Sequence, residues 1–153
     1  MKNSEILNMD EFERVNLQRC DGPFNCGTKT NLYWGVALAE EVGELAGAIK
    51  KLDRGFNKRE LAKMRKKYDG KPEDMPTDEE FQRAWYFDKM KSIGHEAADI
   101  FICLNLLCQK NKLNLSTMVV QKFNLVSKEM ELGPEYFLPT IEQIKNLSQN
   151  NGN

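Results

Sequence analysis

Apolar residues recur at three- and four-residue spacings along most of this chain, and the apolar–polar alternation typical of strands is almost absent. Only 5 prolines and 10 glycines interrupt the 153 residues. The pattern therefore predicts an all-α fold, a bundle of four to six helices. A chain of this length can bury one hydrophobic core without disulfides, and we expect a single domain over residues 1–145.

Start and stop signals divide the chain into expected helices. Asp21-Gly22-Pro23 ends the first, Gly55 is the expected C-cap of the second, and Thr77-Asp78-Glu79-Glu80 has the form of a capping box. The expected helices cover about residues 9–19, 32–54, 77–110 with an interruption near Gly94, and from about 116 to before Gly133. The polar residues 146–153 are expected to form a disordered tail.

The near-neutral net charge argues against nucleic acid as a partner. Lys plus Arg (22) nearly cancels Asp plus Glu (23), so no global field draws the chain to nucleic acid, and we expect no nucleic-acid partner.

The first residues lack the regions of a signal peptide, and no apolar run is long enough to span a bilayer. We therefore expect a cytoplasmic protein without membrane contact. Its four cysteines are expected to be free thiols.

Two acidic clusters stand inside apolar, helix-forming segments. The first contains Glu40, Glu41 and Glu44. On a helical projection at about 100° per residue, an apolar stripe forms the expected core face, and Glu41 and Glu44 lie on its shoulder while Glu40 lies further round. That stripe consists of Leu38, Val42, Leu45, Ile49 and Leu52. Lys51 projects on the same side as Glu44, where a basic group could meet a phosphate.

The second cluster, Glu96 and Asp99, lies in a segment that is apolar on nearly every side from residue 97 to 107. Such a helix is expected in the core or between subunits. Two buried carboxylates one turn apart repel each other and need a compensating cation. Lys or Arg from another helix would serve, and so would Mg²⁺ or Mn²⁺, which prefer oxygen ligands. The alternative is that these acidic pairs simply lie on solvent-exposed helix faces.

A di-iron bundle is excluded because it requires Glu-x-x-His on each of two helices. The chain has a single histidine, His95, and neither acidic pair is followed by one.

The spacing Glu40-Glu41-x-x-Glu44 followed by Glu96-x-x-Asp99 resembles the paired signature of the MazG-like all-α nucleoside triphosphate pyrophosphohydrolases, the superfamily that includes dimeric dUTPases and dCTP pyrophosphatases. Further similar segments span residues 16–128 in the same order. They are Asn16-x-x-Arg19-Cys20, Trp34, Ile49-Lys50-Lys51 with Arg54-Gly55, and Lys122-Phe123-Asn124-x-Val126-Ser127. The resemblance implies a MazG-like bundle that cleaves a nucleoside triphosphate between its α and β phosphates, giving a monophosphate and pyrophosphate.

The resemblance also implies roles for particular residues. Glu41, Glu44, Glu96 and Asp99 correspond to the metal ligands, with Mg²⁺ as the expected cofactor and Mn²⁺ as a substitute. Glu40 would position or deprotonate the attacking water. Four residues are candidates for phosphate or sugar contacts: Lys122, Asn124, Lys51 and Arg54. For Lys122 the alternative is a solvated helix face.

Two further residues are candidates for contact with the nucleobase. Trp34 could stack on a base, although core packing is the commoner fate of a tryptophan on an amphipathic helix. Asn16 could read a base edge or lie on the surface.

The chain departs from the family pattern between its acidic clusters. Roughly fifty residues separate Glu44 from Glu96, far more than a short helix connection needs. The surplus, residues 56–92, is interpreted as an extra helical insertion that forms a hairpin, a lid or a subunit contact. Within it, residues 57–71 carry seven basic residues against two acidic ones. We expect a homo-oligomer, a dimer or tetramer. The alternative function is a catalytically silent helical module that senses a nucleotide or docks a protein.

Overall fold

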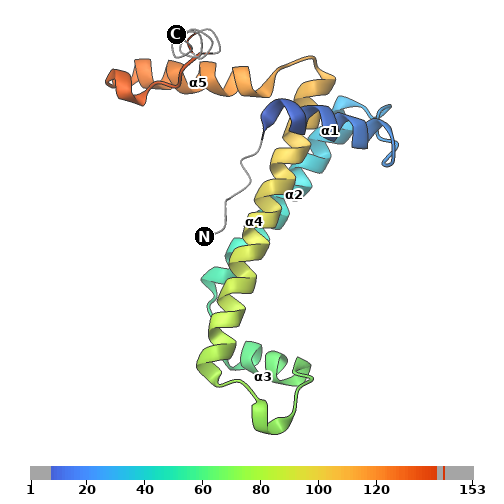
Figure 1. Cartoon of the computed structure of the whole chain (residues 1–153), viewed down its shortest axis with the longest axis vertical. Coiled ribbons are helices and arrows are strands. Elements are labelled where there is room, and N and C mark those ends of the chain that lie inside the picture. The colour runs from blue at the N-terminus through green and yellow to red at the C-terminus, as the bar shows by residue number, and fades with distance from the viewer. Residues whose placement is uncertain (1–7, 141–142, 144–153) are drawn as a thin grey trace, which may run out of the picture. The chain divides into compact units, whose positions relative to one another are not determined.

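The computed structural model describes residues 8–140 and 143, and these residues form helices and no strands. The elements are α1 (Met9–Asp21), α2 (Asn31–Asp53), α3 (Lys58–Lys67), η1 (Pro72–Asp74), α4 (Asp78–Lys110), α5 (Leu115–Glu129) and η2 (Pro134–Tyr136) (Figure 1). The all-α class predicted from the sequence is confirmed. The disordered tail predicted for residues 146–153 lies outside the described residues.

The described chain divides into two compact units. One contains Thr28–Leu104, with α2, α3 and most of α4. The other contains the residues before Thr28 and after Leu104, with α1, the last turns of α4, and α5. Helix α4 is continuous through the boundary. The acidic clusters both belong to the unit Thr28–Leu104.

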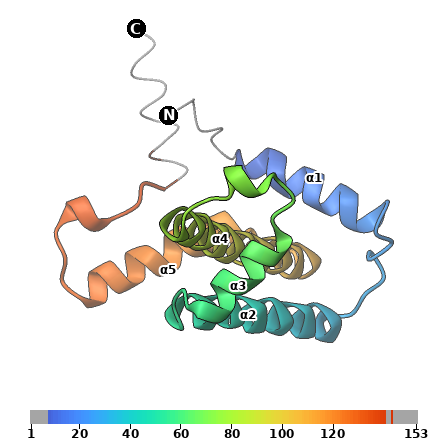
Figure 2. The ribbon, with the colours of Figure 1, turned by 90° about the horizontal axis from the view of Figure 1, so that it is seen from below.

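In the unit Thr28–Leu104, α2 and the Asp78–Leu104 part of α4 run side by side in opposite directions (Figures 1 and 2). Helix α3 lies where α2 ends and α4 begins, so the insertion forms one end of the helix pair. No helix within residues 8–140 is both long and apolar enough to cross a membrane.

The helix ends follow the predicted signals. The Thr30 hydroxyl caps α2 by accepting a hydrogen bond from the Tyr33 N–H, and Gly55 takes the left-handed conformation (φ 71°) just after the helix. The capping box at the start of α4 is present, with Thr77 N–H donating to Glu80 at 2.8 Å and Glu80 N–H donating to Thr77 Oγ1 at 3.3 Å.

The interruption predicted near Gly94 is wrong, because α4 passes through that residue unbroken. A single helical glycine costs about 1 kcal/mol relative to alanine, which the flanking helix formers can offset.

The prediction of the core face of α2 is partly wrong. Val42 and Ile49 are 50% and 41% exposed, although both belong to the predicted stripe. The side that faces α4 is instead centred near Glu41. Its members are buried or half-buried and recur at three- and four-residue spacings: Trp34, Ala37, Leu38, Glu41, Leu45, Ala48 and Leu52. The covered face is rotated about the helix axis from the predicted stripe toward Glu41, so Val42 and Ile49 lie outside it.

The segment 97–107 of α4 is less buried than its apolar sequence predicts. Ala97, Ala98 and Asp99 are exposed, residues 100–104 are half-buried, and only Asn105 and Leu106 are buried. Within the unit Thr28–Leu104, α2 is the one long helix beside this stretch of α4 (Figure 2).

In the other unit, polar side chains tie α1 to the end of α4. Asn16 Nδ2 donates to Asn105 Oδ1 at 3.0 Å between two buried residues. The Lys110 ammonium donates to the Gly27 carbonyl at 2.6 Å and pairs with Asp21 at 3.2 Å. These contacts fix the turn after α1 against α4.

Candidate metal centre

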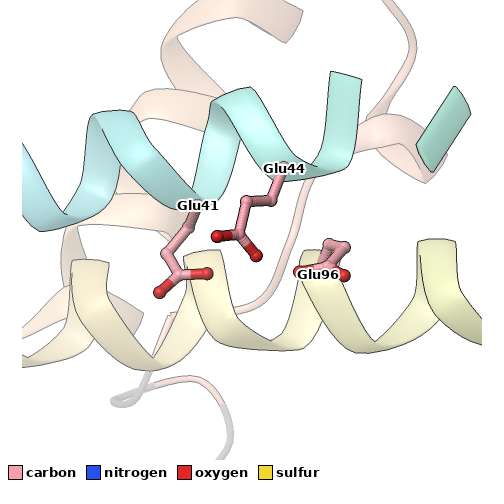
Figure 3. A group of neighbouring side chains, drawn as sticks. All are labelled: Glu41, Glu44 and Glu96. Carbon is pink, nitrogen blue, oxygen red and sulfur yellow. The ribbon is translucent and has the colours of Figure 1, made fainter. Parts of the chain in front are cut away.

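Three carboxylates converge from two helices. Glu41 and Glu44 extend from α2, Glu96 extends from α4, and their carboxylates lie between the two helices (Figure 3). One oxygen from each of the three lies within 4.8 Å of the others. Residues three apart share a helix face, so Glu41 and Glu44 are neighbours, and the antiparallel pairing brings Glu96 to the same level.

Burial differs among the acids. Glu41 and Glu96 are half-buried, whereas Glu40, Glu44 and Asp99 are exposed. The pKa of Glu41 is raised above its ordinary value, chiefly because burial penalises its charge. The negative charges of Asp99, Glu44, Glu96 and Glu40 raise this pKa further, in that order. The ionisation of Glu41 therefore depends on the charges of all four other acids of the two clusters.

The donor set fits a hard divalent cation. Among the residues that the structure describes, no lysine or arginine forms an ion pair with any acid of the two clusters. Their repulsion is thus left without a protein counter-charge. Carboxylate oxygens are the ligands that Mg²⁺ and Mn²⁺ prefer, and a divalent ion among them would relieve that repulsion.

Asp99 and Glu40 lie outside the group of three converging carboxylates. Each still acts on Glu41 through its charge. The half-buried thiol of Cys103 lies in the same field, and its pKa is raised chiefly by burial and then by Glu41 and Asp99. This thiol stays protonated at neutral pH and is a poor nucleophile.

Two predicted phosphate contacts lie further along the same helix pair. Lys51 and Arg54 line a cavity of about 560 Å³ at the end of α2, together with residues of α3 and α4. Lys51 follows Glu44 by one heptad, which is about 10 Å along the helix axis. The structure brings Lys51 and Arg54 together at this cavity, with Lys51 one heptad and Arg54 ten residues beyond Glu44.

Trp34 is 5% exposed in the unit Thr28–Leu104, and its ring meets Tyr33 edge-on with 5.2 Å between centroids. Its indole N–H makes no hydrogen bond with the described residues. In the described chain Trp34 therefore packs in the core.

The remaining predicted substrate contacts, Asn16, Lys122 and Asn124, belong to the other compact unit. Asn16 is buried against Asn105. Asn124 donates to the Leu138 carbonyl at 2.9 Å and accepts from the Leu138 N–H at 2.8 Å, so its amide holds the segment after α5. Lys122 is exposed on α5.

Sequence reasoning did not identify four other residues that line the cavity: Arg59 and Lys63 from α3, and Trp85 and Lys89 from α4. The available signal was the basic run of residues 57–71, interpreted as a solvated helix. Only the fold shows that part of this run faces the end of α2.

The chain was also compared with known proteins. No family model, curated protein or solved structure matches it.

Proposed function

We propose that this protein is a metal-dependent nucleoside triphosphate pyrophosphohydrolase with a MazG-like helical fold. The observation that carries the proposal is the convergence of Glu41, Glu44 and Glu96, with one oxygen from each within 4.8 Å of the others. These are three of the four acids that the sequence resemblance assigns as metal ligands. The sequence motif and the geometry select the same residues, which supports a metal site of an enzyme over a solvent-exposed acidic face without function.

In the proposed reaction the three converging carboxylates would hold Mg²⁺, and Asp99, one turn further along α4, would be the fourth ligand. The bound ion would neutralise the triphosphate, polarise the phosphoryl oxygens and lower the pKa of a bound water. Glu40 is exposed beside this cluster and would orient the attacking water and accept its proton. No covalent nucleophile is needed.

The surrounding residues would bind the nucleotide. Lys51 and Arg54 would meet the far end of the phosphate chain. The proposed nucleotide contacts of Trp34, Asn16, Lys122 and Asn124 stay predictions.

We also propose a cytoplasmic homo-oligomer, a dimer or tetramer. Large apolar side chains are exposed along α2 and support a second copy as their cover: Leu32 (77%), Val36 (50%), Val42 (50%) and Ile49 (41%).

The competing function is a catalytically silent helical module. Purified protein incubated with a panel of nucleoside triphosphates and Mg²⁺ should release pyrophosphate and the monophosphate, with no release in EDTA. Glu41→Gln and Asp99→Asn should each reduce that release. Glu79→Gln is the matched control, since Glu79 is an exposed acid of α4 outside the cluster.

Absence of turnover of every nucleotide by the unaltered protein would reject the enzyme in favour of the silent module. Turnover that survives both substitutions in the cluster would show that the reaction takes place elsewhere.

A further inference from the structure

A strong excess of positive charge lines one cavity of a chain whose total charge is −1. The cavity lies where α2 ends and α3 and α4 begin, and measures about 560 Å³. Five of its lining residues are basic and one is acidic: Lys51, Arg54, Arg59, Lys63, Lys89 and Glu60. We call this the basic cavity.

Within the part of the chain that the structure describes, three of these five cations form no ion pair. Lys63 pairs with Glu60 at 2.7 Å, and Lys89 pairs with Asp88 at 2.8 Å. Lys51, Arg54 and Arg59 form no ion pair with any residue that the structure describes. The positive charges around the basic cavity repel each other, and an anion bound inside the cavity would attract all of them.

A buried donor adds to the positive lining. Trp85 is 6% exposed and lines the basic cavity. Its indole N–H lies close enough to the Glu60 carboxylate to help lower the pKa of Glu60, behind the larger effect of the hydrogen bond from Lys63, but no well-formed hydrogen bond joins the two among the described residues. An anion in the basic cavity would accept a stronger hydrogen bond from this N–H.

The backbone and the size of the basic cavity also suit an anion. The first turn of α3 contributes Arg59 and Glu60 to the lining, and the dipole of a helix N-terminus favours negative charge, although the Asn57 side chain already accepts from the N–H groups of Arg59 and Glu60. The volume falls within the roughly 300–1,000 Å³ of small-molecule sites. The Trp85 ring, packed against Phe56 at 5.8 Å between centroids, gives the lining an apolar side.

We propose that the basic cavity binds the phosphate groups of a small, multiply phosphorylated molecule. Arg54 and Arg59 can each grip a phosphate with two parallel hydrogen bonds, and Lys51 adds a point charge. The site is distinct from the carboxylate cluster, because Lys51 and Lys89 each lie one heptad, about 10 Å along the axis, from Glu44 and Glu96. Binding here requires no metal and does not rest on the proposed catalytic function.

Calorimetric titration of the full chain with inorganic tripolyphosphate, in EDTA and at low ionic strength, tests the proposal. The unaltered protein should bind one tripolyphosphate, and Lys51→Ala or Arg59→Ala should each weaken binding about tenfold, as loss of one charged contact does. Lys51→Arg should restore most of the affinity. These side chains are exposed, so circular dichroism should show unchanged helix content in each variant.

Lys50→Ala is the matched control, because Lys50 is the preceding exposed lysine of α2 and does not line the basic cavity. Its affinity should match that of the unaltered chain. Glu96→Gln should also retain binding. No binding by the unaltered chain, an equal loss in Lys50→Ala and Lys51→Ala, or a loss in Glu96→Gln would each overturn the proposal.

The same variants distinguish two sources of the phosphate. If the KM for a nucleoside triphosphate rises in Lys51→Ala in step with the loss of tripolyphosphate affinity, the basic cavity holds phosphates of the substrate. If KM stays unchanged while tripolyphosphate affinity falls, the cavity serves a separate phosphorylated ligand. Both results support the site, and the metal-free titration decides the proposal even if the protein turns over no nucleotide.

Discussion

The carboxylate cluster and the basic cavity have opposite charge and share α2 and α4, while α3 contributes only to the basic cavity. Glu44 and Lys51 lie on one face of α2, a heptad apart, and Glu96 and Lys89 have the same separation on α4. That separation of about 10 Å equals one Debye length at 0.1 M salt, so the two regions neutralise each other only weakly. Keeping them apart leaves each region able to bind a ligand of opposite charge.

The largest expected effect is on turnover. Glu96→Gln removes one of the three converging carboxylates and should lower the rate of pyrophosphate release by about a thousandfold. Asp99→Asn should cost less, about 10- to 100-fold, because this proposed fourth ligand lies outside the group of three converging carboxylates. Rates at saturating Mg²⁺ and nucleotide measure both. A larger loss in Asp99→Asn than in Glu96→Gln would contradict the ranking given by the geometry.

Metal binding should stabilise the protein in a way that separates the two regions without any turnover. Mg²⁺ or Mn²⁺ at about 100 times its Kd contributes about 2.7 kcal/mol, which raises Tm by about 5–10 °C in a chain of this size. Thermal melts with and without the ion measure the shift. Glu96→Gln should abolish it, whereas Lys51→Ala should keep it in full. Equal shifts in both variants would show that the ion binds elsewhere.

The metal-free protein should respond to Glu41→Gln in the opposite direction. The raised pKa of Glu41 means that its charge destabilises the fold, so the neutral glutamine should raise Tm in EDTA. This destabilisation is complete above the folded-state pKa and disappears as pH falls toward the ordinary value of 4.5. The Tm difference between the two proteins should therefore be largest near pH 7 and shrink in acid. A difference that grows in acid would contradict this cause.

Much of the fold was predictable because its signals are local. The capping box Thr77–Glu80 and the C-cap glycine Gly55 each depend on a few adjacent residues, and both are present as predicted. Gly94 shows where a local rule fails, since a helix of 33 residues continues past a single weak position. The core face of α2 depends on which side its neighbour covers, and the apolar stripe alone could not specify that this side is rotated toward Glu41.

The two charged regions differed in how far the sequence could predict them. Glu41, Glu44 and Glu96 were recognisable because acids inside apolar helices are unusual and need a cation. The basic cavity combines the end of α2 with Arg59 of α3 and Trp85 of α4. Its residues become neighbours only when the insertion turns back onto the helix pair, and a basic run alone resembles any solvated helix.

The smallest predicted effect comes from removing the N-cap of α3, which should affect the basic cavity and leave the carboxylate cluster unchanged. The Asn57 side chain caps α3 by accepting from the Arg59 and Glu60 N–H groups at 3.0 and 3.2 Å, so Asn57→Ala should cost about 1 kcal/mol and fray the first turn of α3. Because Arg59 lies in that turn, affinity for tripolyphosphate should fall severalfold while the metal-induced rise in Tm stays unchanged.

Asn114→Ala is the matched control, since Asn114 caps α5 in the other unit by accepting from the Thr117 N–H at 2.7 Å. It should lower Tm by a similar amount without changing tripolyphosphate affinity. If both variants lost that affinity equally, the loss would reflect general destabilisation, and the first turn of α3 would have no specific part in holding the anion.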